Sequence, residues 1–213
     1  MYQLSDELWF PNPAAANSDG LLAIGGDLSE ARLMLAYNSG IFPWFEKNQP
    51  ILWWSPDPRM VLFPHNFKLS KSLRQTLRSG KFRITFNEDF EQIITQCANV
   101  PRKGQSGTWI TKKMIEAYLA LHRSGHALSI EIWQEGEIVG GLYGIDLPQK
   151  KIFCGESMFS LVSDASKVAF YYLSEYAKSK NYIVIDCQIY NLHLESLGAF
   201  AIHRNDFLDY INF

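Results

Sequence analysis

Apolar and polar positions alternate in patterns that divide the second half of the chain into distinct elements. Residues 127–134 have the two-residue period of a strand, EGE turns the chain, and 138–145 returns as the hairpin partner. A third strand is expected over 152–158, followed by a helix over 165–179. The segment 182–189 (YIVIDCQI) is apolar on both faces, which is typical of a central strand covered by helices.

The patterns in the first half are weaker. Residues 1–60 are rich in Pro, Gly and Trp and contain one predicted short helix, over 30–38, so we expect a small, loop-rich N-terminal lobe there. N-cap residues predict further helices over 70–79 and 111–124. A larger domain, which includes the first of these two helices, would then span 61–213.

Strand hairpins with a helix ahead of the central strand predict an α+β fold, with a mixed, mostly antiparallel sheet and flanking helices. This order of elements matches the acetyl-CoA-dependent N-acetyltransferases (a GNAT-like fold). Acetyl-CoA binding in that fold needs a glycine-rich phosphate cradle before the main helix, whereas MFSLVSDAS has no glycine. The fold analogy therefore assigns no chemistry by itself, and an acyl-CoA acetyltransferase stays an alternative.

Composition restricts the cellular setting and the cofactors. The chain has 213 residues, of which 47% are hydrophobic, enough for a sizeable core. It has neither an apolar run of about 18 residues nor a secretory signal, so we expect a cytoplasmic protein without a membrane segment. We also expect a monomer. Three cysteines without CxxC spacing and five histidines without a zinc pattern predict no disulfide framework, no metal and no cofactor.

Charge is segregated along the chain, although the net charge is only −2. Residues 59–113 contain 11 of the 20 Lys and Arg but 3 of the 22 Asp and Glu. Within this segment, Lys71, Arg74 and Arg78 are spaced so that they share one face of the helix predicted over 70–79. Such a face suits a polyanion, although a solvated basic surface without a partner explains the charge equally well.

Three polar residues stand out in apolar strands. Asp186 and Gln188 are two positions apart on the predicted central strand, so we expect both to project from one face. Glu156 directly follows a glycine in an apolar context. A buried carboxylate is costly unless it is satisfied, so each acid belongs either to a functional site or to a structural network. For Glu156, that network would be an ion pair with Lys167 or Arg204.

Tryptophans lie in turn-rich segments beside or within the basic region. Tryptophan rings can stack on unpaired bases, but more often they pack in the protein interior. Trp53 and Trp54 suit packing between the lobes, so we expect stacking only from Trp44 or Trp109.

Ten sequence blocks resemble one known family. The strings GLLAIGGDLS, SGIFPWF, ILWWSPDPR, GTWI, HALSIEIW, GGLYG, FCGESMFS, ASK, IDCQ and SLGA occur in the order found in leucyl/phenylalanyl-tRNA-protein transferases. The resemblance is specific because ILWWSPDPR and FCGESMFS are long, rare strings. It implies a small N-terminal lobe on an acetyltransferase-like domain, and cytoplasmic action.

The resemblance also implies an activity and its partners. Members of the family transfer Leu or Phe from aminoacyl-tRNA to the α-amino group of proteins that begin with Arg or Lys, which marks those proteins for degradation. We expect the apolar pocket to accept Met as well. The reaction forms a peptide bond from an activated ester, so neither ATP nor a metal is required.

By position, the resemblance assigns roles to individual residues. Asp186, Gln188 and Glu156 match the residues that hold and activate the incoming amine, with Asp186 expected to orient the Gln188 amide. The pocket for the aminoacyl side chain would be formed by Leu142, Phe153, Met158, Phe170, Leu173 and Ile185. The terminal adenosine and substrate would lie near Trp44, Trp109, Tyr37 and Tyr118, and the tRNA backbone near Lys71, Arg74 and Arg78.

Two further alternatives stay open. Transferases that build cell-wall cross-bridges from aminoacyl-tRNA share this fold, although their usual form is longer and duplicated. A non-catalytic reader of basic amino termini would keep Glu156 but would not need Asp186 and Gln188 on one strand face.

Overall fold

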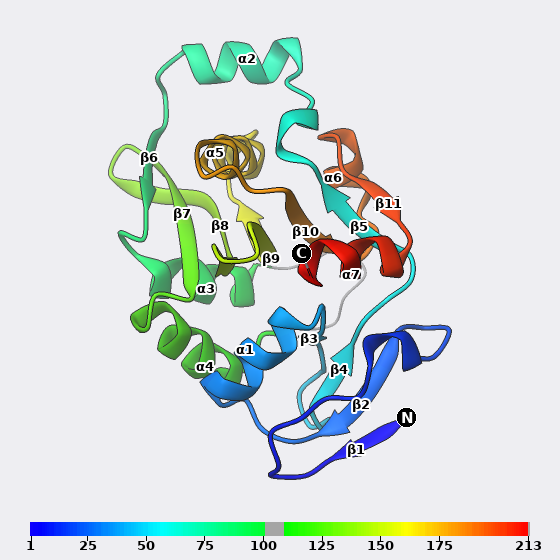
Figure 1. Cartoon of the computed structure of the whole chain (residues 1–213). Coiled ribbons are helices and arrows are strands. Elements are labelled where there is room, and N and C mark those ends of the chain that lie inside the picture. The colour runs from blue at the N-terminus through cyan, green and yellow to red at the C-terminus, as the bar shows by residue number, and fades with distance from the viewer. Residues whose placement is uncertain (101–108, 213) are drawn as a thin grey trace.

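A seven-stranded sheet forms the centre of the molecule, and a four-stranded sheet lies below it in Figure 1. The computed structural model describes residues 1–100 and 109–212, so Arg102 and Lys103 of the basic segment, and Phe213, lie outside the described residues. The large sheet has the strand order β11-β5-β10-β9-β8-β7-β6. Among its described strands only β9 and β10 pair in parallel, which confirms the α+β fold with a mostly antiparallel sheet.

The elements have the following bounds. The large sheet contains β5 (Arg59–Leu62), β6 (Arg83–Phe86), β7 (Ala127–Gln134), β8 (Glu137–Leu147), β9 (Ile152–Ser160), β10 (Val184–Gln188) and β11 (Phe200–Ile202). The small sheet contains β1 (Tyr2–Leu4), β2 (Leu21–Gly25), β3 (Phe42–Pro43) and β4 (Leu52–Trp54). The helices are α1 (Glu30–Asn38), α2 (Lys71–Arg78), α3 (Phe90–Asn99), α4 (Lys112–Arg123), α5 (Ala165–Ser179), α6 (Leu192–Ser196) and α7 (Arg204–Asn212), with short 3₁₀ helices at Pro13–Ala15 and Pro64–Asn66.

Helices cover both faces of the large sheet and create two cores. Helix α5 packs on β7, β8 and β9 from one side, while α3 and α4 pack on the other. The central strand β10 contributes to both cores, since Val184 lies in the core that includes α3 and α4, and Ile185 lies in the core under α5. Because both faces are buried, the strand is apolar on both, as the sequence predicts. Across the described residues, no helix is long and apolar enough to cross a membrane.

The small sheet and α1 share the core formed by α3 and α4. Trp53 on β4 is fully buried there, and its indole N–H donates a hydrogen bond to the carbonyl of Gly25 at 2.9 Å. Tyr37 on α1 and Tyr118 on α4 are buried side by side and hydrogen-bonded to each other. Residues near the N-terminus therefore pack directly against the wall of the large sheet on which Glu156 lies.

Candidate active site

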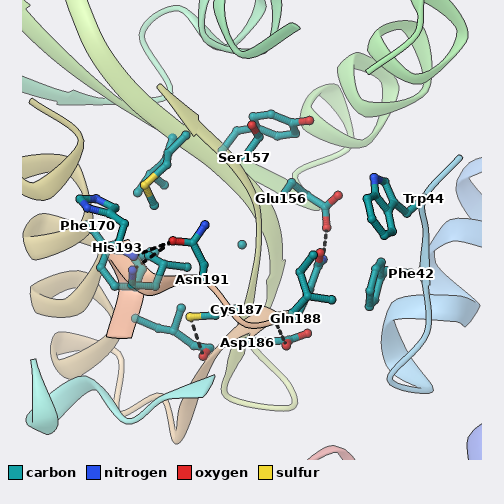
Figure 2. Close-up of a pocket in the computed structure, with 18 of the residues that line it drawn as sticks. Phe42, Trp44, Glu156, Ser157, Phe170, Asp186, Cys187, Gln188, Asn191 and His193 are labelled. Carbon is teal, nitrogen blue, oxygen red and sulfur yellow. Dashed lines mark hydrogen bonds between the residues drawn. The ribbon is translucent and has the colours of Figure 1, made fainter. Parts of the chain in front are cut away.

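A cavity of about 420 Å³ opens where β9 and β10 separate (Figure 2). The two strands pair in parallel as far as Cys154 and Asp186, and beyond this point β9 continues along β8 alone. The cavity lies between these strands, α5, α6 and the β3 segment, and its volume is in the range of small-molecule sites.

A β-bulge on each of the two strands directs side chains toward the cavity. On β9, Gly155 and Ser157 lie opposite neighbouring residues of β8, so Glu156 is the extra residue of a bulge. On β10, Asp186 and Gln188 lie opposite neighbouring residues of β5, and Gln188 adopts a left-handed φ of 66°. The bulge places Cys187 as an extra residue between the two, so it interrupts the regular alternation from which a shared face was expected for Asp186 and Gln188. Bulges of this kind re-aim side chains and are frequent beside active sites.

Glu156 is the centre of a hydrogen-bonded chain in the cavity wall. Its Oε2 accepts a hydrogen bond from the Tyr118 hydroxyl at 2.8 Å, and Tyr118 is hydrogen-bonded to Tyr37. Its Oε1 accepts a hydrogen bond from Gln188 Nε2 at 2.7 Å (Figure 2). Burial raises the pKa of Glu156 to about 7, against the opposing effect of the hydrogen bonds that it accepts. The carboxyl group therefore titrates near neutral pH.

Glu156 orients the Gln188 amide. An ionised carboxylate only accepts hydrogen bonds, so the amide nitrogen faces Glu156 and the amide oxygen is directed elsewhere. That oxygen is then available to a donor in the cavity. The expected role of Asp186 as the group that orients this amide is corrected, since the Gln188 side chain bonds to Glu156 instead.

Asp186 is fully buried and forms an ion pair with Arg59. Arg59 Nε and Nη2 donate hydrogen bonds to the two carboxylate oxygens at 2.8 and 2.7 Å, and the backbone N–H of Gln188 donates to Oδ1 at 2.9 Å. The guanidinium lies over the rings of Phe42 and Phe207, 4.8 and 4.6 Å from their centres. Asp186 thus holds the backbone of the bulge on β10, which in turn places the Gln188 side chain.

Apolar side chains form one part of the cavity. Of the six residues expected around the aminoacyl side chain, five line it, namely Leu142, Met158, Phe170, Leu173 and Ile185. The sixth, Phe153, is fully buried, and its ring lies within 2.6 Å of the point where a Cβ on Gly144 would be. Phe153 therefore packs behind the wall, a position that requires a glycine on the neighbouring strand.

Trp44 and Trp109 both line the cavity, and Figure 2 shows Trp44 at the end away from Phe170. Tyr37 and Tyr118, which were expected near the adenosine and substrate, do not themselves line the cavity and are buried behind Glu156. Tyr118 reaches the cavity wall through its hydrogen bond to Glu156. Trp54 packs against Trp44, with ring centres 5.8 Å apart, as expected of a packing residue.

The three basic residues predicted on one helix face, Lys71, Arg74 and Arg78, are exposed on α2. We call them the basic face. Helix α2 packs on α5, with Leu73 buried beneath it, and lies far from the small sheet (Figure 1). In the part of the chain that the structure describes, no group of three or more His, Cys, Asp or Glu side chains is placed to hold a metal ion.

The ion pairs considered for Glu156 do not form. Lys167 Nζ donates a hydrogen bond to Asp164 at 2.9 Å, and Arg204 donates to the backbone carbonyls of Ser55 and Ala14. The hydrogen bonds from Tyr118 and Gln188 satisfy this buried carboxyl group in place of an ion pair.

Sequence reasoning missed two residues of this region. In the sequence, Arg59 was interpreted only as the end of the N-terminal lobe. A charged residue at the start of an apolar strand needs a buried partner, and this signal could have identified it. His193 lines the cavity from α6, yet it was considered only as a metal ligand.

Comparisons with known proteins agree along nearly the whole chain. A family profile described as leucyl/phenylalanyl-tRNA protein transferase matches residues 61–212, and the profile of its N-terminal domain matches 26–57. The leucyl/phenylalanyl-tRNA--protein transferase of Flavobacterium johnsoniae is 55% identical over 208 residues, which are 98% of this chain and 97% of that protein. The protein of the same name from Thermodesulfovibrio yellowstonii is 56% identical over 207 residues, 97% of this chain and 84% of that protein.

Solved structures show a remote likeness. The match to a GCN5-related N-acetyltransferase from Kribbella flavida extends over 79% of this chain and 59% of that protein, with 8% sequence identity and a TM-score of 0.39. The sequence matches, which extend over almost all of the described fold, are much closer. The chain belongs to the leucyl/phenylalanyl-tRNA-protein transferase family.

Proposed function

We propose that this protein transfers Leu or Phe, and also Met, from aminoacyl-tRNA to the α-amino group of proteins that begin with Arg or Lys. The product carries a new peptide bond and is marked for degradation. We further propose that the protein acts as a monomer in the cytoplasm. The observation that carries the proposal is the cavity in which an apolar pocket adjoins the hydrogen-bonded pair of Glu156 and Gln188.

The two ends of the cavity suit the two parts of an aminoacyl ester. The five apolar residues would surround a Leu or Phe side chain, while Trp44 and Trp109 would contact the terminal adenosine, since aromatic rings stack on unpaired bases. The ester carbonyl would then lie between these ends, near Gln188. The basic face of α2 would contact phosphates of the tRNA backbone.

The chemical step is an aminolysis. The neutral amine nitrogen forms a bond to the ester carbonyl carbon while the bond from that carbon to the ribose oxygen breaks. Gln188 Oε1 accepts a hydrogen bond from the amine and so directs its lone pair at the carbonyl carbon. Ionised Glu156, whose pKa lies at about 7, receives the single proton that the amine nitrogen loses and passes it to the departing ribose oxygen, so that the carboxylate is regenerated.

Modest acid–base help is sufficient for this reaction. An α-amino group has a pKa of about 7.7 to 8.0, so roughly a tenth of it is neutral near pH 7. Positioning of two reactants can contribute about 7–11 kcal/mol in well-oriented systems. We therefore assign most of the rate acceleration to the placement of amine and ester by the two bulges.

The division between chemistry and binding can be tested with variants. Gln188→Ala should lower turnover far more than it lowers tRNA affinity, because the side chain contacts the amine and not the tRNA body. Trp44→Ala should instead weaken binding of the aminoacyl adenosine end. Turnover would be followed as Leu transfer to a peptide that begins with Arg, and affinity by titration of charged tRNA. Equal losses of turnover and affinity in Gln188→Ala would remove Gln188 from the chemical step.

Acceptor selection has its own test. Peptides that differ only in their first residue should react when that residue is Arg or Lys and not when it is Asp. Equal rates for the Arg and Asp peptides would contradict the proposed acceptor class while leaving the donor assignment intact.

A further inference from the structure

His193 lies on the cavity wall, and the proposed mechanism does not use it. It belongs to α6, where its backbone N–H donates a hydrogen bond to Asn191 at 2.9 Å. Figure 2 places His193 beside Phe170, at the apolar end of the cavity, and places Glu156 and Trp44 at the other end. The residue therefore borders the space assigned to the aminoacyl group rather than the space assigned to the adenosine.

The imidazole of His193 contains a buried polar atom that lacks a protein partner. Within the described part of the chain, Nε2 is buried and has no hydrogen-bond partner. Burial lowers the pKa of His193, and the nearby Lys167 lowers it further, so the ring is neutral near pH 7. In a neutral ring that carries its proton on Nδ1, Nε2 is a hydrogen-bond acceptor. A buried Nε2 without a partner is unfavourable in either tautomer, and in the tautomer with its proton on Nδ1 it calls for a donor from a ligand.

An aminoacyl ester offers one donor at this end of the cavity. Its α-carbon bears the side chain, the ester carbonyl and the α-amino group. With the side chain between Leu173 and Met158 and the carbonyl near Gln188, the α-amino group is the polar substituent closest to the apolar end. The ribose hydroxyls belong to the other end, with Trp44 and Trp109.

We propose that His193 Nε2 accepts a hydrogen bond from the α-amino group of the donor aminoacyl ester, which makes His193 a specificity-determining residue. The inference rests on the proposed function. It means that the enzyme selects esters of α-amino acids over other acyl esters that have the same side chain. A hydrogen bond with a charged partner corresponds to about a 10- to 100-fold effect on kcat/KM.

The test compares two donors with the wild-type protein. One is leucyl-tRNA, and the other is the same tRNA esterified with 4-methylpentanoate, which is leucine without its α-amino group. The acceptor is a peptide that begins with Arg. We expect kcat/KM to be about 10- to 100-fold higher for the leucyl ester. Equal values would overturn the inference without the need for any variant, whereas failure to transfer leucine at all would instead refute the proposed function.

Variants then locate the selectivity. His193→Phe should bring the ratio of the two donors close to one, while His193→Gln, whose amide oxygen is an acceptor, should retain part of it. The matched control is His203→Phe, since the His203 side chain is 85% exposed and does not line the cavity. A His193→Phe protein that keeps the wild-type ratio would assign the selection to another residue and overturn the inference.

Discussion

Replacement of Arg59 by Met removes the partner of a buried carboxylate. Arg59 and Asp186 have side chains that are each only 1% exposed, and they share two hydrogen bonds. Breaking a buried ion pair by loss of one partner costs about 3–5 kcal/mol. A change of 1 kcal/mol shifts the Tm of a protein of this size by about 2–4 °C, so we expect Arg59→Met to melt about 6–20 °C lower.

The double variant Arg59→Met/Asp186→Leu separates stability from geometry. With both charges removed, no unpaired carboxylate stays buried, and such replacements are often neutral or stabilising. The Tm should therefore return close to that of the wild type. The backbone N–H of Gln188 still loses its acceptor, so the bulge relaxes and the amide is misplaced. Because a displacement of about 1 Å can cost about 100-fold in rate, we expect kcat to stay lower by about that factor.

The Tm is measured by thermal melting followed by circular dichroism, and kcat is measured by Leu transfer to a peptide that begins with Arg. Arg83→Met is the matched control, because Arg83 pairs with Glu88 while both side chains are about half exposed, at 54% and 47%. That exposed pair is expected to contribute less than about 1 kcal/mol. If the double variant recovered both Tm and kcat, Asp186 would not act through the position of Gln188, and our interpretation would be refuted.

Three further predictions concern the proton acceptor, the tRNA and the pocket. In the wild type, the rate of transfer should rise with pH through about 7 as Glu156 loses its proton. The Glu156→Gln variant should show only the later rise near pH 7.7 to 8.0, where the amine of the peptide loses its proton. Identical pH profiles of the two proteins would exclude Glu156 as the group that takes up the proton. Replacement of all three residues of the basic face by Glu should weaken tRNA binding and reduce the slope of log K against log[salt] by about 2–3. The same replacement of Lys150 and Lys151 is the control and should leave the slope unchanged. An unchanged slope in the basic-face variant would show that α2 does not contact the tRNA. Leu173→Ala enlarges the apolar pocket, so kcat/KM for the Leu donor should fall relative to that for the Phe donor by about 10-fold or more. An unchanged ratio would show that the aminoacyl side chain does not bind in this pocket.

Much of the fold was predictable because local patterns specify it. Helix α5 and strand β7 have the expected bounds, although both faces of β7 are buried over its first six residues. Helix α3 was missed although its signal is present, since Phe90, Ile93, Ile94 and Cys97 follow a helical spacing. The strands β1 to β4 have only two to five residues each, and they depend on contacts with one another more than on their own periodicity.

The geometry of the site was less predictable than its composition. Strand periodicity brought Asp186 and Gln188 to attention, but a bulge depends on the register with β5, which a single sequence does not reveal. The pairing of Arg59 with Asp186 joins residues 127 positions apart, and the hydrogen bonds that Glu156 accepts come from α4 and β10. Sequence therefore identified polar residues that need partners, while tertiary contacts determined which partners they have.

The central claim is tested most directly by the mass of an acceptor peptide. The purified protein would be incubated with leucyl-tRNA and a peptide that begins with Arg, without ATP and without added metal. We predict that the peptide gains one leucyl residue, and that fragmentation places it on the α-amino group of the Arg. A peptide of unchanged mass, or one modified at an internal lysine, would contradict the account.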